Sequence, residues 1–234
     1  MKILSICTST MISTCTIMED GEIIGDCNIN QQKTHSESLV PMIKNMLDNL
    51  NIDISEVDLY VMAKGPGSFT GLRIGMTTGK TLAQVFDKDV LGISTLEALA
   101  VSCLTDKYIV PLVDARGGRV YYGIYKWEDE NLVNIKEDSL IFMEDLAQEL
   151  KDTDREYLFV GEGSRIFKDL IIEENLGSLA IEPLNNCIGR GLCYLGEKYY
   201  SKGIKDDIYT LSPAYIRKSQ AQRDLELKEQ NAKK

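Results

Sequence analysis

The residues with the clearest chemical implications are the glycines of the run GPGSFTGLRIGMTTG, which covers positions 65–79. The preceding residues 57–63 are apolar and β-prone, and residues 72–86 have the apolar spacing of a helix, so the run begins at a strand-to-helix turn. Backbone N–H groups at such a turn can hold an anion, and the helix dipole assists them. The run therefore raises the question of phosphate binding.

Two nucleotide-binding motifs are nearly present in this run. A GxGxxG motif that begins at Gly65 would need glycine at position 70, where Thr70 stands. Residues 75–81, GMTTGKT, resemble a Walker A loop that is one residue too short, and they fall inside the expected helix. Neither motif is complete, so the sequence pattern alone does not predict a nucleotide site here.

Gly71, Gly75 and Gly79 recur every four residues and therefore share one face of the expected helix. Each costs a helix about 1 kcal/mol relative to alanine, which indicates that another backbone approaches this face closely. Packing within the chain and a protein–protein interface both explain such a stripe. We predict a partner interface that also includes Met42 and Met46 of an expected helix at 36–50, because methionine suits adaptable surfaces.

Residues suited to catalysis or metal binding are few. The chain has one histidine, His35, which excludes paired-histidine metal motifs, and we expect it to begin a helix. Ser68 could act as a nucleophile only with a base beside it. Asp114 and Arg116 are candidates for nucleotide binding, or else they form a turn closed by Gly117 and Gly118. We predict no catalytic residue and no metal site.

Composition limits the class of protein. The chain has 234 residues, 44% hydrophobic and 26% charged, which is typical of a globular protein. A net charge of −10 disfavours a strong phosphate-binding surface, although residues 217–234 carry six Lys or Arg against three Asp or Glu. No secretory signal or 18-residue apolar run is present, so we expect a cytoplasmic protein that contacts no membrane. The six cysteines have no CxxC spacing and are expected to be reduced.

The order of the expected elements is that of an α/β protein. Strands are expected at 2–7, 13–18, 22–29, 57–63, 90–92, 108–113, 119–125, 132–135 and 157–160, and helices at 36–50, 72–86, 95–103, 143–150 and 187–200. Both halves begin with strands and continue with helices, which suggests a duplicated fold. We expect an N-terminal lobe at 1–106, a C-terminal lobe at 107–215 and a charged helical tail at 216–234.

Five segments together resemble the bacterial TsaB family, also called YeaZ. They are KILSICTSTMISTCTI from residue 2, HSESLVP from residue 35, GPGSFTGLRIG from residue 65, VDARGGRVYY from residue 113 and PAYIR from residue 213. The resemblance extends over nearly the whole chain. It implies a two-lobed fold of the actin-like/sugar-kinase ATPase type, in which each lobe is a mixed sheet with helices.

The same resemblance implies a function. The family is paralogous to the metalloenzyme TsaD and assists it in making N6-threonylcarbamoyladenosine at adenosine 37 of tRNAs that read ANN codons, with TsaC supplying threonylcarbamoyl-adenylate. We therefore expect a non-catalytic scaffold or activator that binds TsaD and the ATPase TsaE and meets tRNA only through the complex. In isolation the chain could form a homodimer. The alternative is a nucleotide-binding or glycoprotease-like enzyme that acts on its own.

The residue at the end of the expected strand 2–7 differs from the one common in the wider superfamily. That position commonly carries an aspartate near the phosphates of the nucleotide, whereas this chain has Cys7 followed by Thr8, Ser9 and Thr10. A cysteine cannot orient Mg²⁺ as a carboxylate does. We therefore expect no tightly bound cofactor, with weak ATP or ADP binding at the cleft or at a site shared with TsaD.

Overall fold

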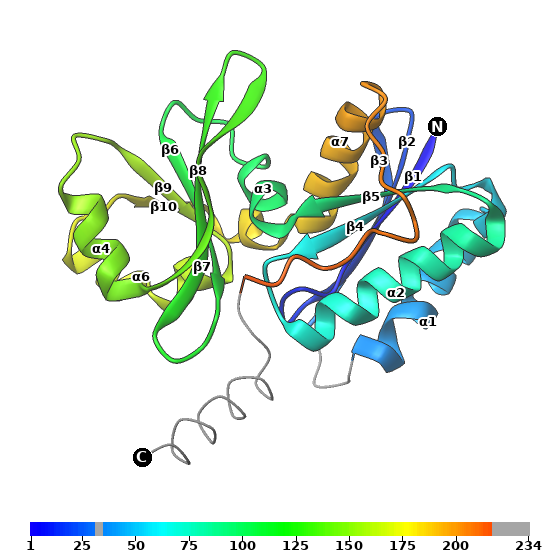
Figure 1. Ribbon diagram of the computed structural model, residues 1–234, viewed down its shortest axis with the longest axis horizontal. Helices are drawn as coiled ribbons and strands as arrows, with labels where there is room; N and C mark the ends of the chain where they lie inside the picture. Colours follow the sequence, from blue (N-terminus) through cyan, green and yellow to red (C-terminus); the bar gives the residue numbers. More distant parts are fainter. Residues whose placement is uncertain (31–34, 217–234) are drawn as a thin grey trace.

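The computed structural model describes residues 1–30 and 35–216 of the chain (Figure 1). These residues form two lobes, each built around one five-stranded sheet, and a cleft lies between the lobes. The expected helical tail at 216–234 lies, except for Ile216, outside the described residues.

The first lobe contains a mixed sheet in the order β3-β2-β1-β4-β5, in which β1, β2 and β3 are antiparallel and β1, β4 and β5 are parallel. Its elements are β1 (Lys2–Cys7), β2 (Ser13–Glu19), β3 (Glu22–Ile29), α1 (His35–Leu50), a 3₁₀ turn (Ile54–Glu56), β4 (Leu59–Gly65), α2 (Phe69–Phe86), β5 (Asp89–Ser94) and α3 (Thr95–Ala100).

The second lobe repeats this arrangement. Its sheet has the order β10-β9-β6-β7-β8, so that β6 corresponds to β1 in both position and pairing. Its elements are β6 (Tyr108–Asp114), β7 (Arg119–Glu128), β8 (Asn131–Phe142), α4 (Met143–Lys151), β9 (Tyr157–Val160), α5 (Glu162–Ile166), α6 (Lys168–Glu173), β10 (Ser178–Leu179) and a 3₁₀ turn (Glu182–Asn186). The repeated sheet order supports the duplication inferred from the sequence.

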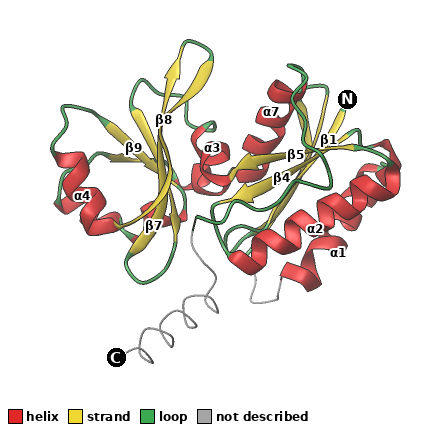
Figure 2. Cartoon of the chain, in the orientation of Figure 1, coloured by secondary structure: helices red, strands yellow, loops and turns green. Residues whose placement is uncertain are grey.

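Helices cover both faces of the first sheet (Figure 2). Helices α1 and α2 lie on one face and enclose a core that includes Leu4, Ile6 and Met62. Helix α7 (Ile188–Tyr200) covers the other face. The core beneath α7 continues through α3 to Tyr121 and Tyr125 of the second lobe, so the two lobes share one central core.

The chain returns to the first lobe after residue 187. Helix α7 packs on β1, β2 and β4, and the residues that follow it run back across the lobe toward the cleft (Figure 1). We call residues 206–216 the strap. Its backbone is held where the amide of Asp206 donates to Val90 O (2.9 Å) and the amide of Ala214 donates to Lys64 O (2.7 Å). The sequence assigned α7 and most of the strap to the lobe at 107–215. In the structure, both pack against the sheet of the first lobe.

The glycine stripe of α2 faces this chain's own sheet. A Cβ atom added at Gly71 would lie 1.9 Å from Thr8 O, and one added at Gly75 would lie 2.5 Å from Thr8 Oγ1. At Gly79 it would lie 2.3 Å from the sulfur of Met62. The close approach that the spacing predicted is present, but the element that approaches is internal.

This burial corrects the predicted partner interface. Gly71, Gly75 and Gly79 are all buried, and Met42 and Met46 of α1 retain only 4% and 8% exposure within the same core. The five residues lie in the interior because α1 and α2 must bury an apolar face against the sheet. A partner that meets these two helices would contact their opposite faces.

All six cysteines are free thiols. Among residues 1–30 and 35–216, no helix combines the length and the apolar character that crossing a bilayer requires.

We predict that Gly71→Ala destabilises the fold, because the added methyl group would overlap the Thr8 carbonyl oxygen, a backbone atom that cannot move away alone. Overpacking of this kind costs about 1–3 kcal/mol, which lowers the melting temperature of a chain of this size by roughly 2–12 °C. Thermal unfolding followed by circular dichroism measures the shift. Thr81→Ala, at an exposed position of the same helix, is the control. Equal melting of the two variants would contradict the internal packing.

Candidate functional site: the interlobe cleft

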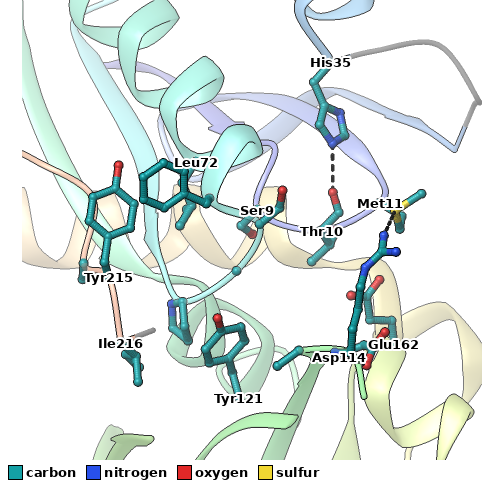
Figure 3. Close-up of a pocket in the computed structure, with 17 residues that line it drawn as sticks. Ser9, Thr10, Met11, His35, Leu72, Asp114, Tyr121, Glu162, Tyr215 and Ile216 are labelled. Atoms are coloured by element: carbon teal, nitrogen blue, oxygen red, sulfur yellow. Dashed lines mark hydrogen bonds between the residues drawn. The ribbon is translucent and has the colours of Figure 1, made fainter. Parts of the chain in front are cut away.

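The cleft between the lobes is the candidate site, and its cavity measures about 260 Å³. One wall comes from the turn after β1, the start of α1 and the start of α2, and the opposite wall from the ends of β6 and β9 (Figure 3). The strap closes one end with Tyr215 and Ile216. The cavity lies just below the usual size range of small-molecule sites.

His35 fixes the turn after β1. Its Nε2 lies 3.0 Å from the carbonyl oxygen of Thr10, so Nε2 carries the hydrogen and donates (Figure 3). Its Nδ1 lies 2.6 Å from Ser13 Oγ. Both ring nitrogens are thus engaged in holding the turn, and His35 begins α1 as the sequence predicted. The arrangement makes His35 a structural residue.

Ser68 is also committed to local structure. Its backbone N–H donates to Ser9 O (2.7 Å), and its hydroxyl oxygen accepts from the N–H of Gly71 (3.2 Å) as the N-cap of α2. The glycine-rich segment therefore lies directly on the turn that would have to face a phosphate. His35, the one histidine of the chain, is engaged by Thr10 and Ser13 and is not available to Ser68 as a base.

Cys7 ends β1 beneath this turn. Burial raises the pKa of its thiol, and its sulfur lies 3.0 Å from Ser9 Oγ. The residue is therefore a neutral thiol in the core and offers no carboxylate to a metal ion. Among the residues that the structure describes, no group of three or more His, Cys, Asp or Glu side chains is arranged to hold a metal ion.

Asp114 and Arg116 lie together at the cleft. The Asp114 carboxylate accepts the backbone N–H of Arg116 (2.9 Å), and Arg116 has a left-handed backbone with φ of 62°. The two residues thus form the turn between β6 and β7 and also line the cavity. The guanidinium of Arg116 reaches across to the sulfur of Met11, 4.0 Å away.

Glu162 is a cleft residue that the sequence interpretation missed. It begins α5, directly after β9, and its side chain lies beside Asp114 (Figure 3). Burial raises the pKa of its carboxyl group, and the negative charge of Asp114 raises it further. Hydrogen bonds with the backbones of Met11 and Asp114 act in the opposite direction. A strand followed by Gly161-Glu162-Gly163 was the available sequence signal.

The charges around the cavity do not suit nucleotide phosphates. Two carboxylates, Asp114 and Glu162, face it, and Arg116 is the one lining residue among those described that carries a permanent positive charge. The amide of Ser68, which could otherwise reach a phosphate, already donates to Ser9. The residues present therefore fit a bound nucleotide poorly. The predicted weak ATP or ADP binding stays a prediction.

The chain is similar in sequence and in fold to several known proteins. The family model described as "TsaD: tRNA N6-adenosine threonylcarbamoyltransferase" matches residues 22–224. The chain is 31% identical to the tRNA threonylcarbamoyladenosine biosynthesis protein TsaB of Bacillus subtilis over 95% of this chain and 96% of that protein. Its fold is similar to that of YeaZ from Pseudomonas aeruginosa, with a TM-score of 0.75, 22% identity and coverage of 92% and 99% of the two chains. MreB 5 of Spiroplasma citri has a TM-score of 0.50 at 11% identity, over 86% of this chain and 97% of that one.

The repeated sheets on either side of one cleft define an α/β protein of the two-lobed actin-like fold, as the sequence predicted. Within this fold, the 31% identity to the Bacillus subtilis protein over nearly the full length of both chains identifies the family. The chain belongs to the TsaB family, also called YeaZ.

We predict that Glu162→Gln raises the melting temperature at neutral pH. The folded state binds the Glu162 proton more tightly than the unfolded state, so stability falls as pH rises from the unfolded pKa through the raised folded pKa. Glutamine removes the buried charge and keeps an oxygen that can accept hydrogen bonds.

The gain should shrink toward about pH 4, near the ordinary pKa of glutamate, where Glu162 is protonated. Melting curves of both proteins across this range test the prediction. A variant that melts below the parent protein at neutral pH would show that the carboxylate stabilises the cleft.

Proposed function

We propose that this chain is an accessory subunit for the formation of N6-threonylcarbamoyladenosine at position 37 of tRNA. The observation that carries the proposal is the 31% identity, over nearly the whole of both chains, to a protein named for that biosynthesis. The match of residues 22–224 to the transferase family supports a paralogous relation to the catalytic subunit TsaD. In this proposal TsaD performs the transfer, and this chain binds TsaD.

The chemistry of the cleft supports an accessory role. A transferase or peptidase needs a nucleophile or base placed to act on a bound group. Here His35 is held by Thr10 and Ser13, and the Ser68 hydroxyl caps α2. Cys7 stands where the superfamily commonly has an aspartate. These contacts also weigh against the alternative of a glycoprotease-like or nucleotide-dependent enzyme that acts alone.

The outer faces of α1 and α2 are our proposed contact surface for TsaD. The two helices lie side by side on the outside of the first lobe (Figure 1). A groove of about 330 Å³ runs between them, lined by Leu39, Val40 and Ile74 together with the polar Ser36, Arg73, Thr77 and Thr78. Val40 is 55% exposed, although it stands on a helix whose opposite face is core. An exposed apolar side chain at such a groove suits a helical partner.

Three finer expectations belong to the same proposal. The ATPase TsaE is the further partner, and the complex acts in the cytoplasm. Without TsaD, a second copy of this chain would cover the same α1–α2 groove, because Val40 stays exposed in a monomer. Light scattering of the isolated chain, with and without TsaD, distinguishes the homodimer from the heterodimer.

We predict that threonylcarbamoylation of a tRNA transcript requires this chain together with TsaD. The assay combines this chain, TsaD, TsaE, threonylcarbamoyl-adenylate and the transcript, and each protein is omitted in turn. Omission of this chain should abolish turnover, and this chain without TsaD should give none. Modification by this chain alone at the rate of the full set would identify it as an enzyme.

We predict that Val40→Asp weakens binding to TsaD at least tenfold, which corresponds to about 1.4 kcal/mol, because it replaces the exposed apolar side chain of this groove with a carboxylate. The melting temperature should change little, since the side chain is 55% exposed. Titration calorimetry measures the affinity.

Ile172→Asp is the matched control, because Ile172 is also 55% exposed but stands on α6 of the second lobe. If both variants bind TsaD like the parent chain, the contact surface lies elsewhere. If Ile172→Asp alone loses binding, the second lobe carries it.

A further inference from the structure

A second groove runs between α2 and the strap. Its cavity measures about 680 Å³, and it follows α2 from Arg73 to Gln84 on one side and the strap from Tyr209 to Tyr215 on the other. It is separate from the interlobe cleft, except that Tyr215 borders both. Arg73 and Thr77 also line the α1–α2 groove, whereas Lys80 and Tyr209 line this groove and neither of the other two sites.

The groove is cationic in a protein whose net charge is −10. The residues that line it include Arg73 and Lys80 and no aspartate or glutamate. Neither cation forms an ion pair within residues 1–30 and 35–216. The carboxylate of Asp207, in the strap, accepts the N–H groups of Tyr209 and Thr210.

The two cations are held in fixed positions. Lys80 donates to Leu211 O (2.8 Å). The Arg73 guanidinium lies 4.1 Å from the ring centre of Phe69 and donates through Nε to the Tyr215 hydroxyl (2.9 Å). Arg73 and Lys80 stand seven positions apart on the helix, a distance of about 10 Å along the axis. Three nucleotides of a stacked strand cover a similar length at about 3.4 Å each.

An aromatic ring and several hydroxyl groups complete the groove. Tyr209 is 80% exposed, although it is flanked in the strap by the partly buried Ile208 and by Thr210. Thr77, Thr81 and Ser212 add hydroxyl groups to the lining. Exposed aromatic rings beside cations are the arrangement with which proteins stack single-stranded bases and track their phosphates.

We infer that the groove between α2 and the strap binds RNA, with Arg73 and Lys80 at the phosphates and Tyr209 against a base. The choice of RNA rests on the proposed function in tRNA modification.

An acidic peptide would also meet two cations. It would gain nothing from a tyrosine ring that stands 80% exposed beside them. RNA uses both features, because its bases offer flat faces and its phosphates offer charge. RNA is therefore the occupant that the whole groove favours.

The first test measures the salt dependence of binding. The full chain is titrated at low ionic strength into a fluorescein-labelled tRNA transcript, and anisotropy gives the affinity at several salt concentrations. Lys80→Met should lower the slope of log affinity against log salt by roughly 0.7–0.9, the share of one phosphate contact. Lys80→Arg should keep the slope, since it keeps the charge. Lys80 is chosen because, unlike Arg73, it does not line the α1–α2 groove.

The second test removes the ring. Tyr209→Ala should weaken binding roughly tenfold, within the range found for loss of one base–aromatic stack. Tyr209→Phe keeps the ring and should bind like the parent chain. Because Tyr209 is 80% exposed, both variants should fold normally, and their melting curves verify this. Lys168→Met, an exposed lysine of α6, controls for loss of charge elsewhere.

Four results would overturn the inference. They are no saturable binding at low salt, an equal change of slope in Lys168→Met, normal binding by Tyr209→Ala, and displacement of the RNA by polyglutamate at equal concentration of charge. The last would identify an acidic protein segment as the occupant. The tests need no threonylcarbamoylation, so a failed omission assay with normal RNA binding would contradict only the proposed function.

Discussion

The close packing of α2 on the turn after β1 is the contact on which the rest of the molecule depends. Gly71 allows the helix backbone to meet the backbone of Thr8, and the Thr8 hydroxyl donates to Gly71 O (2.6 Å). This contact places the start of α2 against Ser9, where the Ser68 amide donates a hydrogen bond to Ser9 O. The same glycine segment that suggests phosphate binding in the sequence therefore occupies the place where a phosphate would have to bind.

The central core imposes a second constraint, because it joins the lobes. Helices α3 and α7 lie between the two sheets and bury apolar residues from both. A polar contact reinforces the junction, since the Asp138 carboxylate accepts the hydroxyls of Tyr125 (2.6 Å) and Ser94. Burial raises the pKa of Asp138, and these two hydrogen bonds oppose the increase. The lobes are thus joined by apolar packing and by hydrogen bonds to one partly buried carboxylate.

Much of the fold could be predicted from the sequence because its strands and long helices follow simple periods. The strands at 2–7, 22–29 and 157–160 have the predicted bounds, and α1 and α2 differ by one to three residues at their N-termini. Helices α5 and α6 and strand β10 were missed because they have two to six residues, too few for a period to show.

The candidate site was less predictable, because side chains distant in the sequence meet there. Spacing alone showed that Gly71, Gly75 and Gly79 needed a close neighbour, but the identity of that neighbour depends on tertiary packing. Asp114 and Arg116 do line the cleft, but Glu162 stands beside them only because β9 pairs with β6 in parallel and both strands end at the same edge. No local pattern could reveal that adjacency.

The interlobe cleft and the groove along the strap carry charges of opposite sign. The interlobe cleft holds Asp114 and Glu162, whereas the groove along the strap holds Arg73 and Lys80 with no carboxylate among the residues that line it. Two cations give a salt slope of roughly 1.4–1.8, so a fourfold rise in salt weakens such a contact only about seven- to twelvefold. On a chain whose net charge is −10, a contact of that size is measured best at low ionic strength. Its value to an assembly would lie in position, because two fixed cations and one ring set where an RNA strand lies on this lobe.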